Sequence, residues 1–281
     1  MKKILSVALI CAALLTVFSA LAGCSSAGIT IAIPNDPTNE ARALQLLEKQ
    51  GLIKLANDAG TLATVRDISE NPYNITFREV EAAQLPQYLA DLDYAVINSN
   101  YAISAGITPI LTEGTDVSYP NILAVKSGNE TSAKIKALIA AVNSQAVVDF
   151  IRAEYNGAVV CDLTNLTADG IDSTVDYAAL AGQTIKVAAS PTPHADILKI
   201  AKEILATKNI TLEIVEFTDY IQPNQVVESG ECDANYFQHI PYLTDFNEQN
   251  GTHIVSVLAV HHEPMGIYSS KHTTLDDIKN K

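Results

Sequence analysis

Hydrophobic and polar residues follow one another along the chain in an order that predicts strands separated by helices. A short apolar run at 30–33 leads into the turn residues 34–37, and a helical pattern over 40–50 then ends at Gly51. The order strand, helix, strand recurs between 75 and 97, with its strands at 75–80 and 94–97. Alternation of this kind predicts an α/β fold with a mostly parallel sheet.

The middle of the chain continues the pattern, with one polar interruption. A strand is predicted at 122–125, and apolar residues at helical spacing from Ile135 to Ile151 predict one helix. The polar stretch 161–183 is predicted to be a linker. After it we expect further strands at 185–188, 212–217, 233–237, 255–260 and 265–268, with helices near 197–205 and 223–228.

The two halves of the chain also resemble each other. Residues 30–37 are similar to 184–191, because each segment combines a strand, a turn containing proline and a helix start. The later strand–helix–strand segment of 75–97 has a counterpart at 212–237. This similarity favours two lobes of one architecture, and chance similarity between α/β units is the alternative.

The first 23 residues have the pattern of a signal peptide. Lys2 and Lys3 precede an uncharged apolar run over 4–21, which ends in small residues and Cys24. The ending resembles a bacterial lipobox, in which Cys24 is lipidated and becomes the first mature residue. An uncleaved membrane-spanning helix is the alternative, since the run is nearly long enough to span a bilayer. We therefore expect a lipid-anchored protein at the cell membrane, facing the extracytoplasmic side.

Composition narrows the classes of function. The 281 residues are 48% hydrophobic, which is an ordinary globular composition and excludes a disordered chain. The net charge of −14, without a basic patch, argues against a nucleic-acid partner. Beyond the predicted signal peptide and Cys24, the cysteines are Cys161 and Cys232. We expect two unpaired thiols there, with a disulfide as the alternative.

Asn39 and Arg42 are the first candidates for ligand binding. They lie three residues apart near the predicted helix start, where backbone N–H groups and a guanidinium suit a carboxylate. The alternative is a surface arginine paired with Glu40 or Glu48.

Polar and aromatic residues also follow two predicted strands. Asn98 follows the strand at 94–97, and His239 and Tyr242 follow the strand at 233–237. Ligands of α/β sheets bind beyond the carboxyl ends of strands, and such side chains suit a small amphiphilic ligand. Half-buried packing is the alternative for each of them.

Metal and enzyme chemistry find little support in the sequence. His261 and His262 are adjacent, and neighbouring side chains of a strand point to opposite faces, so they cannot readily share a metal. The sequence has no His-x-x-x-His or Cys-x-x-Cys spacing, no phosphate-binding loop and no nucleophile elbow. We therefore predict no metal, no cofactor and no catalytic residue.

Several segments closely resemble the methionine-binding lipoproteins of the NlpA/MetQ type. The matching segments are 33–44, 190–195, 216–220, 235–239 and 262–268, and 155–160 looks like the family's carboxyl end. Together the matches cover nearly all of 29–160 and 184–281. Members of the family usually begin with the second of these blocks, so the chain resembles a circular permutant. Recombination between tandem gene copies is the alternative origin.

The resemblance implies a two-lobed fold of the periplasmic-binding-protein type II class. It places one lobe at 24–108, joined by 270–281, and the other at 109–269, including the linker 161–183. Arg42 and Asn39 would hold the ligand's α-carboxylate, and Asn98 would orient its head group. The side-chain pocket would be walled by Tyr220, Phe237, His239, Tyr242 and His261.

The function implied is that of the substrate-binding lipoprotein of an ABC importer. The lobes would close on L-methionine or a related amino acid and deliver it to a membrane permease with its ATPase. The alternatives are another small ligand, such as a methionine-containing dipeptide, a surface lipoprotein without a transport role, or an enzyme on the same scaffold.

Overall fold

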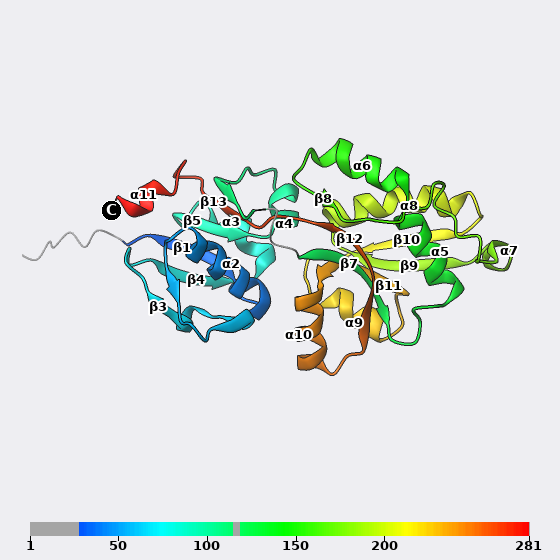
Figure 1. Ribbon diagram of the computed structural model, residues 1–281, viewed down its shortest axis with the longest axis horizontal. Helices are drawn as coiled ribbons and strands as arrows, with labels where there is room; N and C mark the ends of the chain where they lie inside the picture. Colours follow the sequence, from blue (N-terminus) through cyan, green and yellow to red (C-terminus); the bar gives the residue numbers. More distant parts are fainter. Residues whose placement is uncertain (1–27, 115–118, 281) are drawn as a thin grey trace, which may run out of the picture.

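The structure is a computed structural model that describes residues 28–114 and 119–280, which form two lobes side by side (Figure 1). Each lobe is built on a sheet of its own. The first sheet has the strand order β4-β1-β5-β13-β6, and the second has the order β10-β9-β11-β7-β12-β8. The predicted two-lobed α/β fold is therefore confirmed.

The first lobe combines the start and the end of the described chain. Its main strands are β1 (Thr30–Pro34), β4 (Thr76–Val80), β5 (Tyr94–Ile97), β6 (Leu111–Thr112) and β13 (Gly266–Tyr268). The helices are α2 (Pro37–Lys49), α3 (Leu85–Tyr88), α4 (Ser99–Ser104) and α11 (Asp276–Lys279). Shorter elements are β2 (Lys54–Leu55), η1 (Gly60–Leu62), η2 (Val65–Asp67), β3 (Ile68–Glu70) and η3 (Ala82–Gln84).

Alternation along β1 explains how this lobe packs. Ile31 and Ile33 belong to the buried cluster that includes the apolar side of α2, whereas Ala32 belongs to the cluster with α3 and α4. Successive side chains of a strand point to opposite faces, so helices cover the sheet on both sides. The α2 helix begins where Asp36 accepts a hydrogen bond from the backbone N–H of Asn39 at 3.0 Å.

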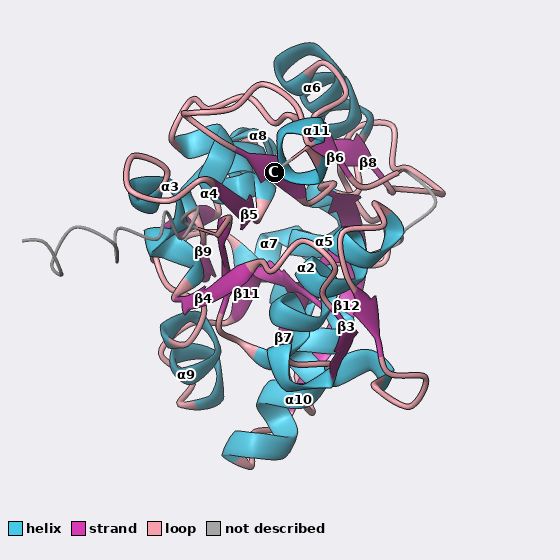
Figure 2. Ribbon diagram, turned by 90° about the vertical axis from the view of Figure 1, so that its left-hand side faces the viewer, coloured by secondary structure: helices cyan, strands magenta, loops and turns pink. Residues whose placement is uncertain are grey.

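The second lobe is a continuous stretch of chain. Its strands are β7 (Pro120–Lys126), β8 (Val160–Cys161), β9 (Thr184–Ala189), β10 (Thr211–Glu216), β11 (Ala234–His239) and β12 (Ile254–His262). Its helices are α5 (Ala133–Val142), α6 (Gln145–Tyr155), α7 (Tyr177–Leu180), η4 (Pro191–Ala195), α8 (Asp196–Ala206), α9 (Gln222–Glu228) and α10 (Ile240–Asn250). Figures 1 and 2 both show α6 and α8 on one side of this sheet and α9 and α10 on the other.

The similarity between the two halves of the sequence is reproduced in the sheets. In the first sheet β1 lies between β4 and β5, and in the second β9 lies between β10 and β11, with parallel pairing throughout. The predicted pair of related units is confirmed. The prediction of a mostly parallel sheet holds only for these strands, because the other strands of the two sheets (β6, β7, β8, β12 and β13) pair antiparallel.

Two local predictions were wrong. The single helix over 135–151 is two helices, because α5 ends at Asn143 and the side chain of Ser144 then caps α6. The stretch 161–183 is not a free linker. It contains α7, and its Val175 and Leu180 are buried in the core of the second lobe.

The chain passes between the lobes twice, from β6 to β7 and from β12 back to β13. The predicted boundary of 109–269 for the second lobe was therefore too wide, since β6 and β13 pair within the first sheet. Within the ranges described, we find no helix with the length and apolar character needed to span a membrane. The predicted signal peptide and Cys24 lie outside the described residues.

Candidate functional site

A pocket lies between the two lobes, beyond the carboxyl ends of β5 and β11. It encloses about 370 Å³ of free space, including its open mouth. Its walls come from both lobes and are polar and aromatic. The lining residues are Asn39, Arg42, Asn98, Ser99, Asn100, Asn121, Tyr220, Phe237, Gln238, His239, Tyr242 and Glu263. All of the predicted ligand-binding residues except His261 are among them.

Arg42 is a buried cation with fixed partners. Its side chain, on α2, donates from Nε to Oε2 of Glu113 at 3.2 Å and from a terminal nitrogen to Oε1 of the same carboxylate. A terminal nitrogen also donates to the Glu263 carbonyl at 2.8 Å, and the guanidinium carbon lies 4.2 Å from the ring centre of Tyr119. The alternative of a surface arginine paired with Glu40 or Glu48 was therefore wrong.

Asn39 lies close to polar side chains of both lobes. Its Nδ2 group donates to Asp36, and its Oδ1 accepts a hydrogen bond from Asn98 Nδ2 at 2.8 Å. The same oxygen lies 3.3 Å from His239 Nε2, which belongs to the other lobe. Burial and the positive charge of Arg42 lower the pKa of His239 to about 3, so this imidazole is neutral at physiological pH.

Aromatic rings form the opposite wall of the pocket. Tyr220, Phe237 and Tyr242 have ring centres 5.8 to 6.0 Å apart, in tilted and edge-on arrangements. Burial raises the pKa of Tyr220 well above its ordinary value, and its hydroxyl donates to Asn100 of the first lobe at 2.8 Å. This wall is apolar toward its centre and hydrogen-bonded at its edge, which suits the apolar side chain of a small ligand.

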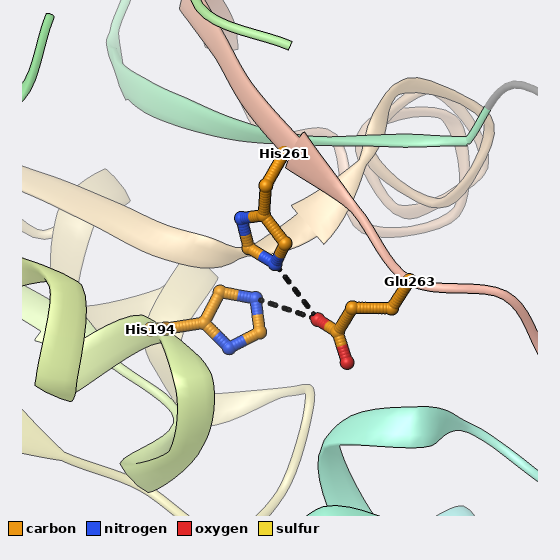
Figure 3. Close-up of side chains that lie close together, drawn as sticks. All are labelled: His194, His261 and Glu263. Atoms are coloured by element: carbon orange, nitrogen blue, oxygen red, sulfur yellow. Dashed lines mark hydrogen bonds and ion pairs between the residues drawn. The ribbon is translucent and has the colours of Figure 1, made fainter. Parts of the chain in front are cut away.

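His261 lies behind the pocket and is not part of its lining. It is completely buried, bonds Tyr236 through Nδ1, and has its Nε2 at 2.9 Å from Oε1 of Glu263 (Figure 3). The neighbouring His262 instead faces Asp162, at 2.8 Å. The expectation that these adjacent histidines point apart is confirmed, whereas the structure does not place His261 at the pocket wall.

His194, His261 and Glu263 are the described residues best placed to hold a metal ion. One potential ligand atom from each lies within 4.8 Å of the others, and His194 Nε2 is 3.6 Å from Glu263 Oε1. Burial lowers the pKa of both imidazoles to about 3. A metal on His194 Nε2 would leave the ring proton on Nδ1, which has no acceptor among the described residues. The geometry therefore favours a hydrogen-bonded cluster over a metal site.

Sequence reasoning missed several polar residues of the lining. Asn121 is the second residue of β7 and Glu263 follows β12, next to the two points where the chain crosses between lobes. The signal used for Asn98, a polar residue beside a strand end, applies to both and was not applied. Cys161 and Cys232 are free thiols, as expected, and neither lines the pocket.

The comparison with known proteins gives one family. The family model described as NlpA lipoprotein matches residues 19–162 and 185–281. "Outer membrane lipoprotein 3" of Mannheimia haemolytica is 44% identical over 137 residues, covering 47% of this chain and 52% of that protein. The "D-methionine-binding lipoprotein MetQ" of Escherichia coli O157:H7 is 41% identical over 139 residues, covering 47% of this chain and 51% of that protein.

A solved structure is also similar over part of its length. It is a nutrient binding protein from Burkholderia cenocepacia bound to methionine, 44% identical, with a TM-score of 0.45. The match covers 46% of this chain and 57% of that one. The chain therefore spans about half the length of the curated relatives it matches.

Proposed function

The chain belongs to the NlpA lipoprotein family, and from that premise we propose that it binds methionine or a close amino-acid relative between its lobes, as the substrate-binding lipoprotein of an ABC importer. One observation carries the proposal. The guanidinium of Arg42 on one lobe and the aromatic wall of Tyr220, Phe237 and Tyr242 on the other line the same pocket. One relative is named a D-methionine-binding lipoprotein, so methionine is the first ligand to test.

The chemistry of the two walls fits the two ends of this ligand. Arg42 offers a fixed, delocalised cation for an α-carboxylate, and Asn39 and Asn98 offer amide groups for the rest of the head group. A thioether side chain is apolar and polarizable and makes favourable contacts with aromatic edges. Ligand binding would therefore use both lobes at once.

Transport then follows from movement of the lobes. A hinge motion would bring the lobes together around the ligand, and the hydrogen bond from Tyr220 to Asn100 already joins them in the arrangement described. The closed form would dock on a membrane permease that is driven by an ATPase. Lipid on Cys24 would keep the receptor near that permease and raise its effective concentration there.

Titration calorimetry on the lipid-free mature protein tests the proposal. We expect binding of methionine, with the L and D isomers compared in separate titrations, and a higher melting temperature in its presence. Replacing Arg42 by alanine should weaken binding by several kcal/mol, because the ligand carboxylate would lose its charged partner in a buried site. The matched control is Arg66→Ala, which removes an exposed arginine outside the pocket.

The alternatives give different results in the same experiment. A preference for a methionine-containing dipeptide would change the ligand and keep the binding role. Mass spectrometry that shows conversion of the bound ligand would indicate an enzyme. If no amino acid or peptide changes the melting temperature, the proposal is wrong and a surface role without transport is favoured.

A further inference from the structure

A second, largely apolar groove lies beside the pocket, also between the two lobes. It encloses about 1160 Å³ of free space, including its open mouth. Its apolar members come from both lobes and are Ala83, Pro86, Ala105 and Pro191. Asn100 lines both the groove and the pocket, so the two spaces adjoin each other at this residue.

Two hydrogen bonds cross between the lobes where the groove adjoins the pocket. Tyr101 belongs to α4, which Figure 1 shows on the side of the first lobe that faces the second. Its hydroxyl donates to the backbone carbonyl of Thr218 in the second lobe at 2.9 Å. In the opposite direction, the hydroxyl of Tyr220 donates to Asn100 Oδ1 at 2.8 Å. Tyr101 and Thr218 line the groove, whereas Tyr220 lines the pocket. The two tyrosines therefore form the boundary between these spaces.

The ring of Tyr101 supports the aromatic wall of the pocket from the side of the groove. Its centre lies 5.2 Å from that of Tyr220, and the two planes are tilted by 36°. Tyr220 in turn packs against Phe237 and Tyr242, with ring centres 5.8 Å away in both cases. Closely packed side chains do not yield without cost, so Tyr220 cannot move outward while Tyr101 stays in place.

The hydroxyl groups of this boundary keep their protons. Burial raises the pKa of Tyr101 and Tyr220 above the ordinary value of a tyrosine. Each hydroxyl therefore remains a hydrogen-bond donor at physiological pH, and each ring stays tied to the opposite lobe.

We propose that Tyr101 is a specificity-determining residue that limits the length of the ligand's side chain. The inference rests on the proposed function, in which the aromatic wall contacts the side chain of an amino acid. A longer side chain would have to displace the packed rings of Tyr101 and Tyr220, which is unfavourable. Without the ring of Tyr101, the pocket would open into the groove, whose apolar members suit additional methylene groups.

The test compares methionine with its S-butyl analogue, 2-amino-4-(butylthio)butanoic acid, by titration calorimetry on the lipid-free mature protein. The wild type should bind methionine at least about 30-fold more tightly, because the longer chain overfills the pocket. In Tyr101→Ala, the analogue should bind within about 3-fold of methionine, since its chain then passes into the groove. The ratio of the two affinities is the readout, because a general loss of structure would weaken both ligands alike.

Two further variants separate the ring from the rest of the lobe. Tyr101→Phe keeps the ring and removes only the hydroxyl, so it should retain a preference for methionine of at least about 10-fold. Tyr88→Ala is the matched control, because it removes a half-buried tyrosine of the same lobe that lines neither the pocket nor the groove. It should leave the ratio of affinities as in the wild type.

The outcomes separate this inference from the proposed function. If the wild type binds no amino acid at all, both fail together. If it binds methionine and the S-butyl analogue equally well, the inference alone is overturned. An unchanged ratio in a folded Tyr101→Ala protein also overturns it. If Tyr101→Ala does not fold, Tyr101→Leu takes its place, since leucine is shorter than tyrosine and should lower the ratio in the same direction.

Discussion

At the scale of single residues, the pair formed by Arg42 and Glu113 joins the pocket to both connections between the lobes. Glu113 lies just after β6 and accepts a hydrogen bond from the backbone N–H of Met265 at 2.9 Å, next to β13. Both members of the pair are almost completely buried. In the proposed function, a ligand carboxylate would have to share Arg42 with the internal carboxylate of Glu113.

This arrangement makes a prediction for Glu113→Gln. The variant should lose about 3 kcal/mol of unfolding free energy, because Arg42 becomes a buried charge without its partner. Methionine should raise its melting temperature more than that of the wild type, since the ligand carboxylate would then replace the missing charge. Urea unfolding and thermal shift, each with and without ligand, measure the two effects.

The matched control for Glu113→Gln is Glu70→Gln. It breaks the pair between Lys54 and Glu70, whose side chains are 59% and 64% exposed, and should change stability by less than about 0.5 kcal/mol. A smaller ligand-induced shift in Glu113→Gln than in the wild type would show that Glu113 assists the ligand instead of competing with it.

The buried histidines predict how stability depends on pH. Burial lowers the pKa of His194 to about 3 in the folded state, while the unfolded chain binds a proton near 6.5. The stability that this histidine contributes is therefore complete above pH 6.5 and is lost as the pH falls toward 3. Glu263 has the opposite effect on the pH dependence of stability. Burial raises its pKa, so the folded state binds a proton more readily than the unfolded chain, and this contribution to stability is lost as the pH rises.

His194→Gln isolates the contribution of one histidine. Between pH 6 and 4 the wild type should lose up to about 1.4 kcal/mol more stability per pH unit than this variant, which corresponds to one proton. Urea unfolding at a series of pH values gives both slopes. His253→Gln, which removes a side chain that is 73% exposed, is the control. Equal slopes for His194→Gln and the wild type would mean that His194 is protonated in the folded state.

At the scale of elements, local signals predicted the longer strands and the helices α2, α3, α8 and α9, but they did not predict α4 or α10. The strand at 94–97 was predicted with its observed ends, because four buried residues follow one another between polar ones. The helix boundary at Asn143 was missed, since apolar spacing alone does not show that Ser144 caps a new helix. The packing of 161–183 was missed because polar composition hides the few apolar residues that contact the core.

The candidate site was predictable to a similar degree. The binding residues were predicted from their positions beside strand ends and from the family resemblance. All of them except His261 line the pocket. Glu263 and Asn121 also lie beside strand ends, but local patterns do not show that they meet in one pocket, because that depends on how the chain passes between the lobes. His194 was missed for the same reason, since it meets Glu263 only through tertiary structure.

A prediction about α7 tests whether 161–183 is part of the folded lobe. Leu180 is 5% exposed within the core of the second lobe. Leu180→Ala should therefore lower the unfolding free energy by about 2–4 kcal/mol, as for other buried leucines. The control Ser173→Ala, at an exposed position of the same stretch, should stay within about 0.5 kcal/mol. Equal and small effects in urea unfolding would mean that the stretch is a free linker after all.

At the scale of the whole molecule, each lobe has its own sheet and buried core, although the order of the two sequence blocks departs from the order that the family resemblance implies. Ile29, before β1, and Ile278, on α11, lie in the same buried cluster of the first lobe. Figure 1 shows α11 near the start of β1. The fold therefore provides a place where the two ends can be joined, and stability should depend on the contacts and hardly on the order of the blocks.

The reordered chain tests this argument directly. The reordered chain would begin at Gln183 and continue through 281. A short Gly/Ser linker would then lead to Gly28, and the chain would end at Gly182. The new ends are therefore at two exposed residues, and 161–182 stay attached. We expect a monomer by size-exclusion chromatography and a methionine affinity within about 3-fold of the parent, because permutation at exposed sites keeps the core contacts. The parent chain is measured beside it under identical conditions. A parent that elutes as a dimer, with a reordered chain that elutes as a monomer, would instead show that the parent exchanges halves between two molecules. Failure of the reordered chain to fold would mean that the present order of the blocks is itself required for the fold.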